Sequence, residues 1–131
     1  MTEPVRVVQD MYAAFQTGDI PAVLALMAED IDLQHNQTPD LPYSGHYRGR
    51  AQAAQFFDKL GAAVQVSSFT PERYVCEGDE VVAMGVWSGT ARPTGKPFTA
   101  RWAMYWQVKD GQAVAYTNYE DSGVTAAAFR A

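Results

Sequence analysis

The chain has 131 residues, a net charge of −5 and one cysteine, Cys76. This is the length of a single domain, expected over residues 1–131, and it excludes an internal disulfide or a zinc site built on clustered cysteines. Lysine and arginine are scattered, the polar segment "MTEPVRVVQD" does not have the pattern of a signal peptide, and no apolar run approaches the roughly 18–20 residues that span a bilayer. We therefore expect a cytoplasmic protein that binds neither nucleic acid nor membranes.

Two helices are predicted at the start of the chain. Apolar residues recur at helical spacing over residues 5–15. Thr2 suits the N-cap of this helix, and Gly18 suits its end. Asp19 is expected to cap a second, shorter helix with a proline in its first turn.

A histidine interrupts the strand that follows. Residues 31–35 alternate, and the side that carries Ile31 and Leu33 ends in His35, where the pattern calls for an apolar residue. A loop rich in proline and glycine comes next. Residues 50–63 then predict a third helix whose apolar side holds Ala54, Phe57 and Leu60, with Phe56 beside it.

The second half of the chain predicts an antiparallel sheet. Turn sequences separate four strands, which we place at residues 69–77, 80–90, 98–109 and 113–120. A short helix over residues 122–131 closes the chain. Because helices come first and strands later, the fold class is α+β, with helices on one face of the sheet.

Strict alternation in the last two strands predicts which side chains face inward. In the first of them Trp102, Met104 and Trp106 share one face, opposite Arg101, Ala103 and Tyr105. In the second the inward residues are Val114, Tyr116, Asn118 and Glu120. Such apolar faces suggest a sheet curled around a cavity, although alternation alone does not distinguish a cavity from a filled core.

Three segments of the chain resemble a known superfamily. These are "TGDIPAVLALMAEDIDL", the loop ending "SGHYRG", and "VKDGQAVAYTNYED". Their order resembles the nuclear-transport-factor-2-like superfamily, and within it the SnoaL-like and ketosteroid-isomerase-like group. The resemblance implies a cone-shaped, cystatin-like fold: a strongly curved, mostly antiparallel sheet packed with three N-terminal helices and a short C-terminal helix. It also implies an apolar pocket and a homodimer formed through the outer sheet faces, near Ala103, Tyr105 and Tyr119.

The resemblance also indicates which chemistry is retained. His35 falls where the isomerases carry their carboxylate base, but Met11 and a position near Met104 replace their tyrosine and their neutral carboxylic acid. Asn118 replaces a carboxylate of the epoxide-hydrolase-like relatives. Steroid isomerisation and epoxide hydrolysis are therefore not expected in their usual form.

Four residues are the catalytic candidates. His35 is the predicted general base, with a pKa below its ordinary value of about 6.5 because of burial. Asn118 would orient a ligand carbonyl or fix the tautomer of His35, Tyr12 would donate a hydrogen bond, and Glu120 is the remaining inward carboxylate. Three of them also have an ordinary structural interpretation: His35 as a core histidine, Asn118 as a structural amide and Tyr12 as a core tyrosine.

The predicted ligand-binding residues are Tyr43, Trp87, Trp102, Met104, Trp106 and Tyr116. Two histidines, His35 and His46, lie too far apart in the chain for a recognisable metal motif, so neither a metal nor a cofactor is expected. The leading function is a cofactor-independent SnoaL-like enzyme of isomerase, cyclase or hydratase/dehydratase type. It would apply acid–base chemistry to a small hydrophobic molecule that carries a carbonyl. The alternative is a non-catalytic small-molecule-binding or dimerisation module of the same fold.

Overall fold

The computed structural model describes residues 3–35 and 38–131, and it has the α+β architecture that the sequence predicts. The elements in chain order are α1 (Glu3–Gln16), α2 (Ile20–Ala25), β1 (Met27–His35), β2 (Gly45–Arg48), α3 (Arg50–Ala63), β3 (Val64–Glu77), β4 (Glu80–Ala91), β5 (Pro97–Lys109), β6 (Gln112–Glu120) and α4 (Ser122–Ala128). Within these described residues, none of the helices is both long enough and apolar enough to cross a membrane.

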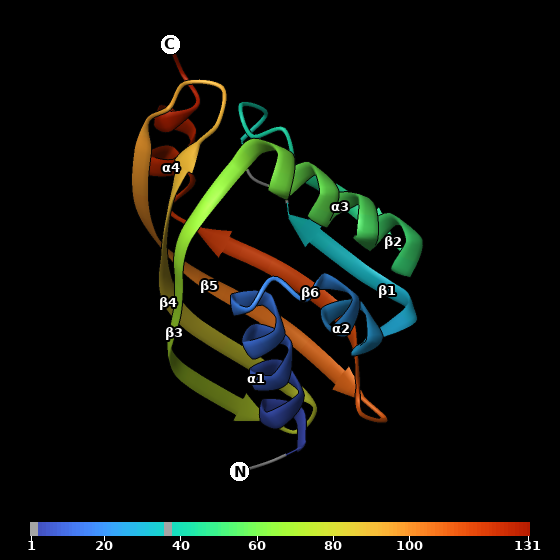
Figure 1. Ribbon diagram of the computed structural model, residues 1–131. Coiled ribbons are helices and arrows are strands. Elements are labelled where there is room, and N and C mark those ends of the chain that lie inside the picture. The colour runs from blue at the N-terminus through green and yellow to red at the C-terminus, as the bar shows by residue number, and fades with distance from the viewer. Residues whose placement is uncertain (1–2, 36–37) are drawn as a thin grey trace.

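The strands form one open, mixed sheet in the order β2-β1-β6-β5-β4-β3. β1 runs parallel to β6, and the other neighbours are antiparallel. The sheet curves strongly, and α1, α2 and α3 lie over its inner face (Figure 1). α1 packs on β3 to β6, α3 packs on β1 to β3, and α4 contacts β5 at one end. The cone-shaped fold is therefore confirmed.

The residues predicted to end the first helix and to cap the second do so in the structure. Gly18 follows α1 with a φ of +76°, a conformation in which a glycine costs little. The carboxylate of Asp19 accepts a hydrogen bond from the backbone nitrogen of Ala22 at 3.1 Å, which caps α2. The predicted N-cap Thr2 lies outside the described residues.

The third helix has the predicted bounds but a different buried side. Ala53, Phe56, Leu60 and Ala63 are buried, whereas Phe57 is only half-buried. Leu60 is buried as predicted, but Ala53 and Phe56 are buried in place of the predicted Ala54 and Phe57, a difference of one position or a rotation of about 100°. Two adjacent phenylalanines give the same apolar content to both faces, so periodicity alone does not choose between them.

Two strands differ from their predicted bounds, and one was missed. β1 begins at Met27 and β3 at Val64, each several residues earlier than predicted. The short strand β2 follows the proline-containing loop and pairs with the outer part of β1. Four residues are too few to show a period of two, so β2 has no recognisable signal in the sequence.

The alternation along β5 is as predicted. Trp102 and Trp106 are buried on the inner face, and Arg101 is exposed on the outer one. In β6 a register shift opposite Gln107 and Val108 changes the pattern at its start. Ala113 is buried and Val114 only half-buried, so the predicted inward position of Val114 is wrong. The alternation resumes at Tyr116, which keeps the site residues on the inner face.

Candidate functional site

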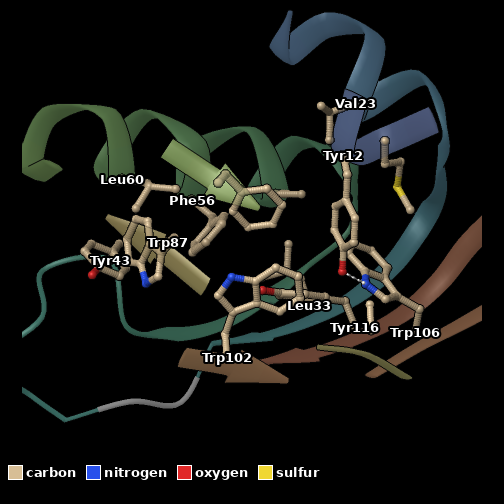
Figure 2. Packing of buried hydrophobic residues seen from close by; sticks show 14 of the residues in the cluster. Tyr12, Val23, Leu33, Tyr43, Phe56, Leu60, Trp87, Trp102, Trp106 and Tyr116 are labelled. Carbon is tan, nitrogen blue, oxygen red and sulfur yellow. Dashed lines mark hydrogen bonds between the residues drawn. The ribbon is translucent and has the colours of Figure 1, made fainter. Parts of the chain in front are cut away.

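A cavity lies between the inner face of the sheet and the helices. Eight of the ten predicted site residues line it, namely Tyr12, His35, Trp87, Trp102, Met104, Trp106, Tyr116 and Glu120. Apolar side chains from α1, α2, α3, β1 and β3 complete the lining, and Figure 2 shows part of it. The two other predicted residues, Asn118 and Tyr43, are buried and contact the lining: Asn118 is hydrogen-bonded to His35 and Glu120, and the ring of Tyr43 meets that of His35 edge-on.

The cavity is small. Its free volume is about 70 Å³, and each enclosed water needs about 10–15 Å³ of such volume, so there is room for roughly five to seven water-sized groups. That is the number of non-hydrogen atoms in a small cyclic ketone. A larger ligand requires the aromatic side chains of the wall to move.

One polar group of the cavity is centred on Tyr12. The indole nitrogen of Trp106 donates a hydrogen bond to the Tyr12 hydroxyl at 2.8 Å, and that hydroxyl lies 3.3 Å from the sulfur of Met104. Burial raises the pKa of Tyr12 far above its ordinary value of 10. Tyr12 is therefore a neutral O–H donor whose partner, a thioether, is a weak acceptor.

The second polar group is a chain of three side chains from β1 and β6. Nδ2 of Asn118 lies 2.9 Å from Nε2 of His35 and 2.9 Å from Oε1 of Glu120. Because an ionised carboxylate only accepts hydrogen bonds, the amide nitrogen faces Glu120 and donates one hydrogen to each partner. Parallel pairing of β1 with β6 brings these distant parts of the chain together.

His35 is a neutral, buried imidazole. Only 4% of its surface is exposed, and burial lowers its pKa to about 4, as the sequence predicts in direction. Its ring packs against Tyr43 and Phe56, with ring centres 5.3 Å and 5.1 Å away. Since Nε2 accepts from Asn118, the ring proton is carried by Nδ1.

Glu120 is held by three donors. Besides Asn118, the Thr125 hydroxyl donates to Oε2 at 2.6 Å and the Trp87 indole at 3.3 Å. Burial raises the pKa of Glu120, and the three hydrogen bonds oppose that shift. The result is a carboxylate that gains a proton more readily than an exposed one. A carboxylate has about four acceptor positions, so one position is left over.

Two of the contacts to Glu120 were not predicted from the sequence. Thr125 lies on the short helix α4, and a single threonine in so short a helix produces no sequence pattern that shows which way it points. Trp87 was predicted to line the cavity. The alternating pattern of β4 indicates that its side chain points inward, but not that its N–H binds Glu120. Sequence patterns give the face of a side chain but not its hydrogen-bond partner.

The second histidine takes no part in this arrangement. His46 on β2 contacts the carboxylate of Asp32 across the β1–β2 pair, away from the cavity. In the part of the chain that the structure describes, no three His, Cys, Asp or Glu side chains come together as a metal site.

Comparisons with known proteins assign the family. A comparison with curated proteins found no significant match. The SnoaL-like domain family matches residues 8–116. Among solved structures, a nuclear-transport-factor-2-like protein of Burkholderia thailandensis E264 is 31% identical over 100% of both chains, with a TM-score of 0.89.

Two further structures extend the comparison. A nuclear-transport-factor-2-like protein of Burkholderia xenovorans LB400 is 29% identical over 98% of this chain and 96% of its own, with a TM-score of 0.86. A "putative polyketide cyclase" of Xanthomonas campestris pv. campestris is 28% identical over 98% and 97%, with a TM-score of 0.79. The family match and the shared fold together show that the chain belongs to the SnoaL-like family of the nuclear-transport-factor-2-like superfamily.

Proposed function

We propose that this chain is a SnoaL-type enzyme that works without a cofactor, by acid–base chemistry, on a small hydrophobic molecule with a carbonyl group. The observation that carries the proposal is the chain of hydrogen bonds from His35 through Asn118 to Glu120, at the wall of an apolar cavity. Buried ionisable groups are costly to a fold. Two of them joined by one amide are therefore expected to serve the chemistry of the site.

The two ionisable groups differ in how well they suit the role of base. The sequence predicts His35 as base, but its Nε2 already accepts from Asn118 and its pKa of about 4 makes it weakly basic. Glu120 lines the cavity, keeps one acceptor position and has a raised pKa. We therefore assign proton abstraction to Glu120, and to His35 the role of orienting Asn118 from the other side.

The proposed step is proton removal next to a carbonyl. The C–H bond of the α-carbon breaks, its proton passes to the carboxylate of Glu120, and the electron pair moves into an enolate. A proton then returns from Glu120 to the same or another carbon. The isomerase and cyclase types share this step. The name of the Xanthomonas relative, which proposes a polyketide cyclase, supports this class of reaction.

The rival function is a binding module without chemistry. It is favoured by the small volume of the cavity, which is lined by three indoles and several phenylalanines. In that case His35, Asn118 and Glu120 recognise a polar group of a ligand and transfer no proton.

Hydrogen–deuterium exchange separates the two functions without knowledge of the natural substrate. Cyclohexanone and smaller cyclic ketones are incubated in D₂O with the protein, and loss of the α-proton signals is followed by NMR. An enzyme of the proposed type accelerates the exchange over buffer and over an equal concentration of heat-unfolded protein. Saturable binding of the ketones without acceleration supports the binding module and contradicts the enzyme.

A further inference from the structure

Three indole rings line the cavity, and they differ in what their N–H groups contact. Trp87 donates to Glu120 at 3.3 Å, and Trp106 donates to Tyr12 at 2.8 Å. The indole nitrogen of Trp102 has no hydrogen-bond partner among residues 3–35 and 38–131, although the side chain is only 3% exposed. A buried N–H without a partner is unusual and costly.

The ring of Trp102 is fixed in place and does not turn to find a partner. It stacks on Phe69, with ring centres 4.8 Å apart and an interplanar angle of 5°, and Tyr12 meets it edge-on at 5.6 Å. Gly85 stands opposite Trp102 on β4, and a Cβ there would lie 2.5 Å from Cζ2 of the indole. A glycine and an aromatic stack thus keep the indole flat on the sheet.

The free N–H lies on the side of the cavity that holds the acid–base group. In Figure 2 the nitrogen edge of Trp102 faces Trp87 and Tyr43, and its six-membered ring faces the Tyr12–Trp106 pair. Trp102 is also the direct cross-strand partner of Glu120. Directly opposed residues on one face have Cβ atoms about 4.5–5.5 Å apart. An unused donor and a carboxylate therefore stand side by side at the cavity wall.

We propose that Nε1–H of Trp102 receives the acceptor oxygen of the ligand, and that this bond places the carbon next to the carbonyl beside Glu120. The inference deepens the proposed function and rests on it for the class of ligand. As negative charge builds on the carbonyl oxygen during proton removal, a fixed N–H in an apolar cavity stabilises it. It also selects against ligands without an acceptor, because these leave the N–H unpaired.

The first test is spectroscopic and uses the wild-type protein. Indole N–H signals of ¹⁵N-labelled protein are recorded with cyclohexanone and with methylenecyclohexane, which has nearly the same shape but no acceptor oxygen. Signals are assigned from Trp87→Phe, Trp102→Phe and Trp106→Phe. Cyclohexanone is expected to move the Trp102 proton downfield, further than the other two, whereas methylenecyclohexane does not. An unchanged Trp102 signal with bound cyclohexanone overturns the inference.

The second test measures affinities for the same two probes. Trp102→Phe keeps a ring to stack on Phe69 and loses the N–H. Cyclohexanone is expected to bind about tenfold more weakly, and methylenecyclohexane equally well. In the matched control Trp106→Phe, which loses an N–H used inside the protein, the ratio of the two affinities stays as in wild type. An unchanged ratio in Trp102→Phe contradicts the inference.

The outcomes separate this inference from the proposed function. If cyclohexanone binds on Trp102 but its α-protons do not exchange, the donor role stands and the enzyme does not. If exchange is accelerated while the Trp102 signal stays unchanged, the enzyme stands and the donor role does not. If neither probe binds saturably, both are contradicted.

Discussion

Asn118 donates a hydrogen bond to Nε2 of His35 at 2.9 Å, and through its other hydrogen it binds Glu120 at the same distance. One amide thus connects the two buried ionisable groups of the cavity wall. The contact assigns the tautomer of His35, since an accepting Nε2 places the ring proton on Nδ1.

The first prediction concerns that tautomer. In wild type, ¹⁵N NMR of the imidazoles is expected to show a protonated Nδ1 and a bare Nε2 for His35 from pH 5.5 to 8. Asn118→Leu removes the donor, and the proton is then free to populate Nε2. His46, which contacts Asp32 instead, serves as the internal reference and is unchanged by the substitution. A proton found on Nε2 of His35 in wild type contradicts the assigned contact.

The second prediction is a dependence of stability on pH. Burial lowers the pKa of His35 from 6.5 to about 4, so the folded state resists protonation that the unfolded chain accepts. The stability gained from a neutral His35 is complete above pH 6.5 and is lost as the pH falls towards 4. The expected loss is about 3 kcal/mol in the free energy of unfolding.

Urea unfolding of wild type and His35→Gln at pH 7, 6, 5 and 4 isolates this effect. Glu120 acts in the opposite sense, because its raised pKa favours the folded state at low pH. It is present in both proteins, so the difference between them reports His35. A difference that stays constant over this range shows that His35 does not have the lowered pKa.

The sequence predicted the inward residues of this site but not their contacts. His35 stood out because it replaced an apolar residue in an alternating strand, and the alternation placed Asn118 and Glu120 inward as well. The hydrogen bonds among them depend on the parallel pairing of β1 with β6. Pairing between strands that are some 80 residues apart leaves no local pattern in the chain, so these contacts required the structure.

The fold was predicted more completely than the details of its elements. Long strands with alternating aromatics, such as β5, carry a strong signal, and turn sequences mark their ends. The four-residue strand β2 carries none. In α3 the burial of Leu60 was predicted, but Phe57 was placed on the buried side instead of Phe56, because the two phenylalanines are adjacent and only packing against the sheet decides between them.

The third prediction concerns Gly85. A Cβ at this position would lie 2.3 Å from the backbone oxygen of Thr70 and 2.5 Å from the ring of Trp102. Gly85→Ala is therefore expected to lower the free energy of unfolding by about 1–3 kcal/mol or more, since backbone and a stacked ring must shift.

The matched control is the same change at Gly61. This glycine lies within α3, and a Cβ there would meet no atom within 4 Å. Gly61→Ala is expected to stabilise the protein by about 0.5–1 kcal/mol, because alanine favours the helix. Equal effects of the two substitutions in thermal or urea unfolding would show that Trp102 does not lie flat over Gly85.

The fourth prediction concerns association through the outer face of the sheet. Tyr119 is 62% exposed there and stands opposite Ala103 on β5, and both residues line a surface hollow of about 470 Å³. We expect a homodimer through this face, and Tyr119→Glu is expected to dissociate it by burying a charge. Val124→Glu, on α4 at 40% exposure, is the control and keeps the dimer. Sedimentation that finds only monomeric wild type at micromolar concentration contradicts the expectation.

The most direct test of the proposed acid–base function replaces the base. Glu120→Gln keeps a side chain of the same shape and hydrogen-bonding reach but accepts no proton. Exchange of the α-protons of cyclohexanone in D₂O is compared between wild type and Glu120→Gln, with the affinity for the ketone measured in parallel. With Glu120 as the base, the rate is expected to fall by roughly 10²–10⁴-fold with nearly unchanged affinity, and His35→Gln is expected to lose less. An undiminished rate in Glu120→Gln would contradict this role, and a loss confined to His35→Gln would return the role of base to the histidine.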